Sequence, residues 1–399
     1  MVNQLPQGWK EEELGKLADV IAGQSPEGIY YNTVGDGTPF YQGKSEFQEM
    51  YLGKPTKWTT KVTKLAKRND ILMSVRAPVG PVNITQEDIC IGRGLAAITA
   101  KSMLLQLYLF YHLRYLEDKI SGTNGAVFAS ISKREIEQIK ITYPIDKEEQ
   151  DYIVKTLDAV AEIIRLRKET IQLAKELIPT IFQEMFGDPE RKICLADVAT
   201  IKGGKRLPYG GQLQDETTVH PYIRVADMVN NTIKKDELKY ISDVIYNKIQ
   251  NYTISSRDVY ISIAGTIGRV GLVPDNLEGA NLTENAAKIV LNENKINKVF
   301  LVYELLTDVL QSQIKSLTVQ AGVPKLAISR IESLKIYCPP LSEQEEFADK
   351  VEQINKYIAA QQEELEQFET LFQSLLHEAF TGVLTWNYPR KECHDKKDK

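Results

Sequence analysis

The chain has 399 residues, of which 43% are hydrophobic and 26% are charged, and its net charge is −5. These values are typical of a globular protein of two or three domains. No apolar run reaches the roughly 20 residues that span a bilayer, and Met1–Pro6 does not begin like a signal peptide, which excludes a membrane protein. The four cysteines and four histidines show no metal-site spacing, so we expect no metal, free thiols and a cytoplasmic location.

The sequence contains two copies of one pattern. The matching segments are residues 17–20 and 195–198, 70–74 and 258–262, and 136–141 and 331–336. Each copy then enters a long helical pattern, in which Gln150 aligns with Gln344. A repeat of this length indicates a duplicated domain. Two such modules related by an internal twofold axis can read oppositely oriented sites on DNA, which is itself twofold symmetric.

The first domain, residues 1–146, is expected to have a mixed α/β fold of the α+β class. Short β-type runs occur at 71–75 and 96–99, and residues 104–116 have a helical period. No regular βαβ alternation is present, which argues against a doubly wound parallel sheet. Residues 54–68 contain six basic residues, one tryptophan and no acidic residue. This run suits a surface that follows phosphates, although a solvated lysine-rich face would have the same composition.

A first spacer helix is predicted over residues 147–189. Apolar residues recur there at alternating steps of three and four, and the seven-residue series is Leu157, Ile164, Ile171, Ile178 and Met185. Such a seam is typical of a coiled coil. Asp146 with Glu149 marks its start, and Pro179 should remove one backbone hydrogen bond and kink the helix near its end.

The second domain, residues 190–340, is expected to repeat the first. Strands are expected at 259–263 and 288–291, and a helix at 299–310. This domain carries 19 Lys and Arg against 16 Asp and Glu, so it is mildly basic although the whole chain is acidic.

A second spacer helix is predicted over residues 341–382, followed by a tail over residues 383–399. Ser342 with Glu345 makes a capping box at the start of this helix. The helical segment has 2 basic residues against 10 acidic ones. The negative charge of the chain therefore lies mainly in this helix.

Each helical seam has one strongly polar residue near its middle, Arg167 in the first helix and Gln361 in the second. The two positions are equivalent in the repeat. If the helices pair antiparallel within the chain, we expect these residues to meet at the twofold axis. The alternative is that each is an independent interruption tolerated by its own helix.

Polar loops recur in both domains with a shared framework and different side chains. The differing pairs are Gln42 and Arg224, Arg76 and Ala264, and Arg93 and Glu284. Arg suits guanine, Gln and Asn suit adenine, and Glu can accept a hydrogen bond from cytosine. The residues predicted to contact DNA are Tyr41, Gln42, Lys44, Lys57, Lys61, Ser74, Arg76 and Arg93 in the first domain and Arg224, Ser262, Thr266, Arg269, Glu284 and Asn285 in the second. The alternative for any one of them is an ordinary surface position.

Motifs of the common enzyme classes are missing. Residues 203–205 (Gly-Gly-Lys) lack the upstream glycine and the hydroxyl residue of a nucleotide-binding P-loop. Residues 387–390 (Asn-Tyr-Pro-Arg) are not the Asn/Asp-Pro-Pro-aromatic motif with which amino methyltransferases hold an extruded base. Local sequence indicates no Cys–His or Ser–His pair. A binding protein without catalytic residues or a cofactor of its own is therefore favoured.

The order of these segments resembles the specificity subunit of type I restriction–modification systems. The resemblance covers residues 5–382 and rests on the repeated domain–helix order, on the entry segments Pro340–Gln344 and Glu149-Gln150, and on the segments Tyr41–Lys44, Arg224–Asp227 and Ile328–Ile331. It implies two target recognition domains that read a bipartite double-stranded DNA site and are spaced by an antiparallel coiled coil. It also implies docking of two methyltransferase subunits and of restriction subunits, which use S-adenosylmethionine and ATP. Pro179 and the tail depart from the family pattern, so no function is carried onto them.

Two other functions stay open at this point. A non-catalytic structural adaptor, whose duplicated domains bind protein, would have the same architecture but would show no DNA sequence enrichment. A standalone nuclease or methyltransferase is disfavoured by the missing motifs.

Overall fold

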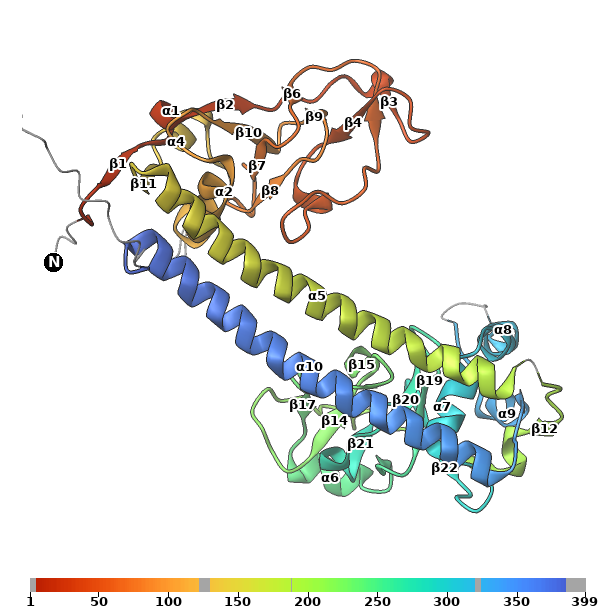
Figure 1. The fold of residues 1–399 in the computed structure, drawn as a ribbon. Helices are drawn as coiled ribbons and strands as arrows, with labels where there is room; N and C mark the ends of the chain where they lie inside the picture. Colours follow the sequence, from red (N-terminus) through yellow and green to blue (C-terminus); the bar gives the residue numbers. More distant parts are fainter. Residues whose placement is uncertain (1–4, 122–129, 188, 320–323, 385–399) are drawn as a thin grey trace, which may run out of the picture. The chain divides into compact units, whose positions relative to one another are not determined.

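The computed structural model describes residues 5–121, 130–187, 189–319 and 324–384 (Figure 1). The chain divides into two compact units. The first unit comprises residues 1–169 and 363–399, and the second comprises residues 170–362. Each unit therefore holds one globular domain and part of both long helices. In the ranges that the structure describes, no helix is long and apolar enough to cross a membrane.

Two sheets and a strand pair form the globular domain of the first unit. The central antiparallel sheet has the order β2-β10-β7-β8, made of Ala18–Ala22, Leu95–Ala100, Ile71–Ser74 and Val82–Ile84. The second sheet has the order β3-β5-β4-β9-β6, made of Tyr31–Asn32, Trp58–Thr59, Thr38–Tyr41, Ile89–Ile91 and Leu65–Ala66. In it, β4 and β9 run parallel. Strand β1 (Trp9–Glu13) pairs with β11 (Lys140–Pro144), which leads into the first long helix.

The helices of this domain are short. The longest is α2 (Gln106–Tyr115), whose side chains from Tyr108 to Leu113 are buried. The others are α1 (Leu14–Leu17), α3 (Glu117–Ser121), α4 (Lys133–Glu137) and the 3₁₀ turns η1 (Gly28–Tyr30) and η2 (Lys44–Glu46). A capping box between Ser132 and Glu135 fixes the start of α4.

The second unit repeats this plan. Its central sheet has the order β13-β22-β19-β20, made of Ala199–Gly203, Ala286–Leu291, Val259–Ser262 and Val270–Leu272. Its second sheet has the order β17-β14-β21-β18, made of Lys239–Tyr240, Pro221–Ile223, Ala280–Leu282 and Thr253–Ile254, and β14 and β21 again run parallel. The remaining strands are the pair β12 (Ile193–Cys194) and β23 (Lys335–Ile336) and the hairpin β15 (Met228–Val229) and β16 (Thr232–Ile233). The helical elements are η3 (Leu195–Asp197), η4 (Val225–Asp227), α6 (Asp243–Ile249), η5 (Asp275–Leu277), α7 (Lys298–Leu306), α8 (Asp308–Leu317) and α9 (Ile328–Glu332).

Matching strand orders and matching turns confirm the duplication. The backbone N of Gly80 donates to the carbonyl of Ser74 at 3.0 Å, and Gly268 donates to Ser262 at 3.0 Å. The domains are of the mixed α+β class, as predicted. The helix expected at 299–310 is present in two parts, α7 and α8, because the chain is interrupted at Thr307. The hydroxyl of Thr307 accepts a hydrogen bond from Leu310 N and so begins a new helix, α8.

The long helices are α5 (Lys147–Phe186) and α10 (Leu341–Thr381). In the first unit, Ile153 near the start of α5 shares a core with Phe380 near the end of α10. Farther along the same unit, Lys168 Nζ lies 2.8 Å from Glu369 Oε1. Residue numbers therefore rise along α5 as they fall along α10. The helical parts within this unit are antiparallel.

The helices begin in different ways. Asp146 Oδ1 accepts a hydrogen bond from Glu148 N at 2.9 Å, which caps α5. The capping box predicted at Ser342 is wrong, because α10 already begins at Leu341 and Ser342 lies inside its first turn. Pro179 lies inside α5, which continues to Phe186.

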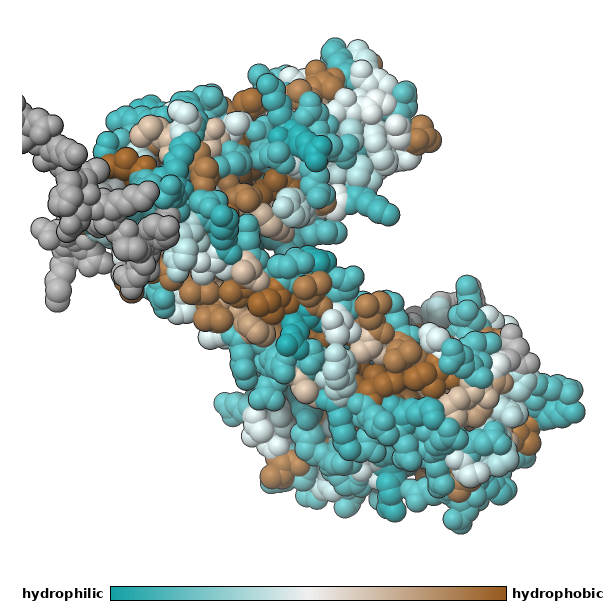
Figure 2. Space-filling model, viewed as in Figure 1, coloured by the Kyte–Doolittle hydropathy of each residue, from teal (hydrophilic) through white to brown (hydrophobic). Residues whose placement is uncertain are grey.

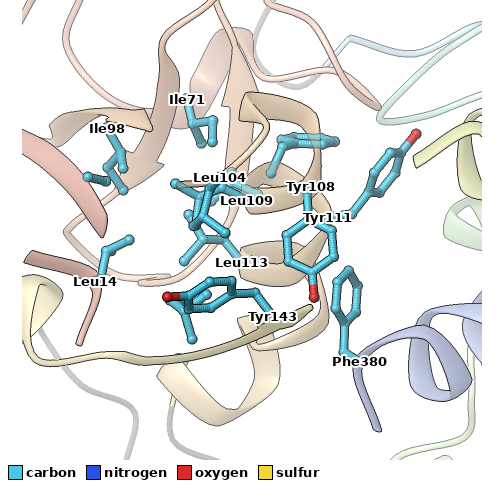
Figure 3. Packing of buried hydrophobic residues seen from close by; sticks show 14 of the residues in the cluster. Leu14, Ile71, Ile98, Leu104, Tyr108, Leu109, Tyr111, Leu113, Tyr143 and Phe380 are labelled. Atoms are coloured by element: carbon cyan, nitrogen blue, oxygen red, sulfur yellow. The ribbon is translucent and has the colours of Figure 1, made fainter. Parts of the chain in front are cut away.

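Each unit has its own hydrophobic core. In the first unit, Figure 3 shows Phe380 beside the aromatic side chains of the domain, and its ring centroid lies 5.4 Å from that of Tyr108. In the second unit, the rings of Phe182 on α5 and Phe347 on α10 are 5.2 Å apart within the domain core. Each domain is thus packed directly onto both helices.

Arg167 and Gln361 fall in different units, and their predicted meeting stays a prediction. Within the first unit, Arg167 Nη1 lies 2.5 Å from Glu364 Oε2. Gln361 is 9% exposed in the second unit. The Arg167 charge is therefore compensated by the Glu364 carboxylate, which stands one position from the apolar heptad positions of α10.

Candidate nucleic-acid interface

Three loops meet at one edge of the first domain: the segment after β4, the turn between β9 and β10, and the loop between β7 and β8. Gly92 N donates to the carbonyl of Tyr41 at 2.8 Å, and Val75 N donates to the carbonyl of Gly94 at 2.9 Å. These bonds bring Gln42, Arg76 and Arg93, all exposed, to one place. We call these three residues the first recognition edge.

The second domain forms the same junction. Thr283 N donates to the carbonyl of Ile223 at 3.0 Å, and Ile263 N donates to the carbonyl of Asn285 at 2.8 Å. The positions equivalent to the first recognition edge hold Arg224, Ala264 and Glu284, which we call the second recognition edge. The pairing of loops predicted from the sequence is therefore confirmed at the level of individual backbone bonds.

A glycine after the first strand of each central sheet lets these loops close. A Cβ on Gly23 would lie 2.1 Å from the carbonyl oxygen of Gly92, and a Cβ on Gly204 would lie 2.1 Å from that of Thr283. Both obstacles are backbone atoms, which cannot rotate away as a side chain can. Only glycine allows the segment after the strand to pack against the turn.

The equivalent turns carry opposite charges. In the first domain the turn residue is the exposed Arg93, whose backbone N donates to Ser25 Oγ at 3.3 Å. In the second domain the turn residue is Glu284, and Arg206 Nε lies 2.7 Å from its Oε1. Burial opposes ionisation of Glu284, but the hydrogen bonds from Arg206 and Thr283 keep its pKa below the ordinary value. The first edge thus offers an exposed guanidinium donor where the second offers a carboxylate that is paired with Arg206.

The basic run lies beside the first recognition edge. Phe40 N on β4 donates to the carbonyl of Lys57 at 2.9 Å, and Lys61 Nζ lies 4.6 Å from the centre of the Tyr30 ring. Lys57 and Lys61 are exposed. Figure 2 shows hydrophilic residues over much of the visible face of each globular domain. Exposed lysines next to a set of polar loops suit contact with a phosphate backbone.

Three residues predicted to contact DNA are buried instead. Tyr41 is 2% exposed, Ser74 is 2% exposed and Ser262 is 0% exposed. The Tyr41 hydroxyl donates to the carbonyl of Gly53 at 2.9 Å, and burial, with Glu87 and Glu46 nearby, raises the pKa of Tyr41 to about 12. The serine hydroxyls donate to carbonyls within their own loops. These three side chains shape the recognition edges from inside and are not exposed for contact with a base.

The other predicted residues keep their place at the surface, some of them in internal bonds. Arg224 Nη2 lies 2.6 Å from Asp227 Oδ1 and also donates to the carbonyl of Glu237. Arg269 donates to two backbone carbonyls. Lys44 and Thr266 are exposed and Asn285 is partly exposed. Contact of these residues with DNA stays a prediction.

Within the ranges described by the structure, no group of three or more His, Cys, Asp or Glu side chains could hold a metal ion.

The family described as "Type I restriction modification DNA specificity domain" matches residues 6–176 and, a second time, residues 190–370. The chain belongs to this family. Each match covers one globular domain with most of the long helix that follows it. The resemblance inferred from the order of the segments is therefore confirmed, and the chain is a specificity subunit with two target recognition domains.

Two proteins with similar sequences are named as specificity subunits. This specificity subunit is 44% identical over 184 residues to the MjaX specificity subunit of Methanocaldococcus jannaschii, an alignment that covers 44% of this chain and 43% of that relative. It is 21% identical to the MjaVIII specificity subunit of the same organism over 96% of this chain and 94% of the relative. The similarity to the MjaX subunit thus covers less than half of the chain.

Two solved structures share the fold. One is the S subunit of a type I restriction–modification system from M. genitalium, with 16% identity, a TM-score of 0.56 and coverage of 95% of this chain and 98% of that chain. The other comes from a study of complex assembly in a type I system, with 18% identity, a TM-score of 0.59 and coverage of 96% and 100%.

Sequence reasoning missed three exposed side chains of this specificity subunit. The Arg206 side chain is 80% exposed beside Glu284, and Tyr209 is fully exposed in the glycine-rich loop after β13. In the first domain, Ile29 is 79% exposed in the corresponding loop after β2. For Tyr209 and Ile29, the signal was an apolar residue among Pro and Gly after the first strand of each central sheet.

Proposed function

We propose that this specificity subunit reads a bipartite double-stranded DNA target, with each recognition edge reading one half of it. The observation that carries this proposal is one scaffold, present twice, with different side chains at equivalent positions of the recognition edges. Gln42 in the first domain corresponds to Arg224 in the second, and Arg93 corresponds to Glu284. Because Arg, Gln and Glu prefer different base edges, the two halves of the target differ in sequence.

Catalysis belongs to the partners in this proposal. The subunit gives sequence choice to two methyltransferase subunits, which methylate adenine with S-adenosylmethionine, and to restriction subunits, which cleave DNA with ATP. It binds neither cofactor itself. The acidic α10, with 2 basic and 10 acidic residues over 341–382, is unsuited to phosphate and fits protein docking. The cytoplasmic location stays a prediction.

Domain exchange tests the proposal. Residues 1–146 are replaced by the corresponding domain of another specificity subunit, and the complex with its methyltransferase subunits is expressed in a host that lacks other adenine methylation. Mapping the methylated adenines shows the target directly. One half of the target should change and the other should persist, because each domain has its own core and its own recognition edge. Change in both halves would contradict the proposal, and absence of any sequence preference would favour a protein-binding adaptor.

A further inference from the structure

Each long helix has a fully buried glutamine in its first turns. Gln150 of α5 and Gln344 of α10 are both 0% exposed. They are equivalent in the sequence repeat. A buried amide is stable only when its donors and acceptor are satisfied, and the partners of these two amides are the same in both units.

Gln150 ties α5 to two backbone segments of the first domain. Its Oε1 accepts a hydrogen bond from Leu105 N at 2.9 Å, directly before α2. Its Nε2 donates to the carbonyl of Met103 at 3.1 Å and to that of Pro144, at the end of β11, at 2.9 Å. One side chain thus joins the helix, the last strand and the segment that enters α2.

Gln344 makes the same set of bonds in the second domain. Its Oε1 accepts from Asn297 N at 2.8 Å, directly before α7. Its Nε2 donates to the carbonyl of Lys295 at 3.2 Å and to that of Pro339 at 2.8 Å. Nε2 also donates to the Sγ of Cys338 at 3.7 Å. The other partners of Gln344 are backbone groups, as are the three partners of Gln150, so these bonds hold the course of the chain.

We propose that Gln150 and Gln344 are positioning residues that fix the direction in which each target recognition domain joins its helix, and that they thereby set the length of DNA spacer that the subunit accepts. This inference rests on the proposed function, because a spacer exists only between two half-sites. The glutamines touch no base themselves.

The spacer length is sensitive to the angle at which each domain meets the start of its long helix, which we call the joint. At about 1.5 Å of rise per residue, the 40 residues of α5 span about 60 Å. A change of roughly 3° at the joint moves the far end by about 3.4 Å, which is the rise of one base pair. Trp9 Nε1 also donates to Glu149 Oε1 at 3.0 Å, but this bond reaches one side chain of α5 and leaves the backbone before α2 untied. The recognition edge should stay intact when the three bonds of Gln150 are removed, because its own bonds lie elsewhere in the domain.

The experiment uses the full subunit in complex with its methyltransferase subunits. Gln150→Met and Gln344→Met keep the side-chain length and remove the three bonds. Binding is measured on DNAs that keep both half-sites and differ only in spacer length, one base pair at a time. The preference for the best spacer over its neighbours should fall about tenfold in each variant, while discrimination against altered half-sites stays at the wild-type level.

Gln106→Met is the matched control. Gln106 also makes three bonds to backbone groups, accepting from Ala100 N and donating to the carbonyls of Asn69 and Ile98, but all of them lie within the domain. It should lower the melting temperature without changing spacer preference. Gln150→Glu, which keeps an acceptor for Leu105 N, should give a smaller relaxation and serves if Gln150→Met does not fold.

Two outcomes separate this inference from the proposed function. Unchanged spacer preference in folded Gln150→Met, Gln150→Glu and Gln344→Met complexes overturns the inference and leaves the proposed function standing. Absence of half-site preference in the wild-type complex overturns the proposed function and the inference with it.

Discussion

His112 and Glu304 accept a hydrogen bond from the same backbone position of the two copies. Thr142 N donates to His112 Nε2 at 3.2 Å, and Tyr337 N donates to Glu304 Oε1 at 2.9 Å. Both side chains are buried. The carboxylate has a charged partner, Arg191, whose Nε lies 2.9 Å from Glu304 Oε1. One scaffold therefore accepts a neutral ring in one copy and a paired charge in the other.

The first prediction concerns the response of the first unit to acid. Burial, helped by Lys119, lowers the pKa of His112 to about 3, below its value in the unfolded chain. The unfolded state therefore binds a proton that the folded state does not, and the stabilisation present above pH about 6.5 is lost as pH falls toward 3, by up to about 1.4 kcal/mol per pH unit. Chemical denaturation of wild type and His112→Gln between pH 7 and 4 measures this. The variant should show the shallower loss, and equal slopes would contradict the assignment.

The second prediction concerns the buried ion pair of the second unit. Arg191→Met leaves Glu304 buried without its counter-ion, which should destabilise the unit by about 3–5 kcal/mol at neutral pH. Burial already raises the pKa of Glu304, against the lowering effect of Tyr337 N and Arg191. The loss of stability caused by Arg191→Met should therefore grow as pH rises. It should shrink toward pH 4.5, where Glu304 can stay protonated in the folded variant.

Chemical denaturation of the variant between pH 7 and 4.5 measures this loss. Lys192→Met is the control, because Lys192 pairs with the exposed Glu190. Adding Glu304→Gln to Arg191→Met should recover part of the stability. If the double variant is as unstable as the single one, the unpaired charge is not the cause.

The third prediction concerns the close approach at Gly23. A Cβ there meets the Gly92 carbonyl at 2.1 Å, so Gly23→Ala should push the turn away from its place. We expect weaker recognition of one half-site only. Gly28→Ala is the control, because a Cβ at Gly28 has nothing within 4 Å. Methylation assays on DNAs altered in either half-site measure both, and equal effects at the two halves would count against the assignment.

The fourth prediction separates base contact from phosphate contact. Arg93→Ala should cost on the order of 1–3 kcal/mol on cognate DNA and relax preference at one position, whereas Lys61→Ala should weaken all sequences alike and reduce the salt slope by about 1. Titrations against cognate and mismatched DNA at several salt concentrations compare them. Arg224 is less suitable for this test, because its replacement also leaves Asp227 unpaired. Sequence-blind losses for both variants would show that the first recognition edge does not read bases.

Features that depend on period and repetition could be predicted from the sequence. The two domains and the two long helices follow from a repeated pattern and from a heptad seam, which need no knowledge of what packs where. The equivalence of Gln42 with Arg224 was found in this way and agrees with the backbone bonds of the structure.

Features that depend on burial could not be predicted. Tyr41 and Ser74 stand next to exposed loop residues in the sequence, and only tertiary packing turns them inward. The start of α10 was misplaced because Ser342 has the side chain of a cap, although the chain already turns into the helix after Pro340. The internal bond between Arg224 and Asp227 joins close neighbours, but loop conformation decides whether their side chains meet.

The division into units has a consequence for synthesis on the ribosome. The second unit is one continuous stretch, residues 170–362, whereas the first needs residues 363–399 as well. Phe372, Leu376 and Phe380 belong to the core of the first unit, yet they are translated after the whole second domain. We therefore expect the domain that is made second to fold first, while the domain that is made first stays open to chaperones until the last turns of α10 leave the ribosome.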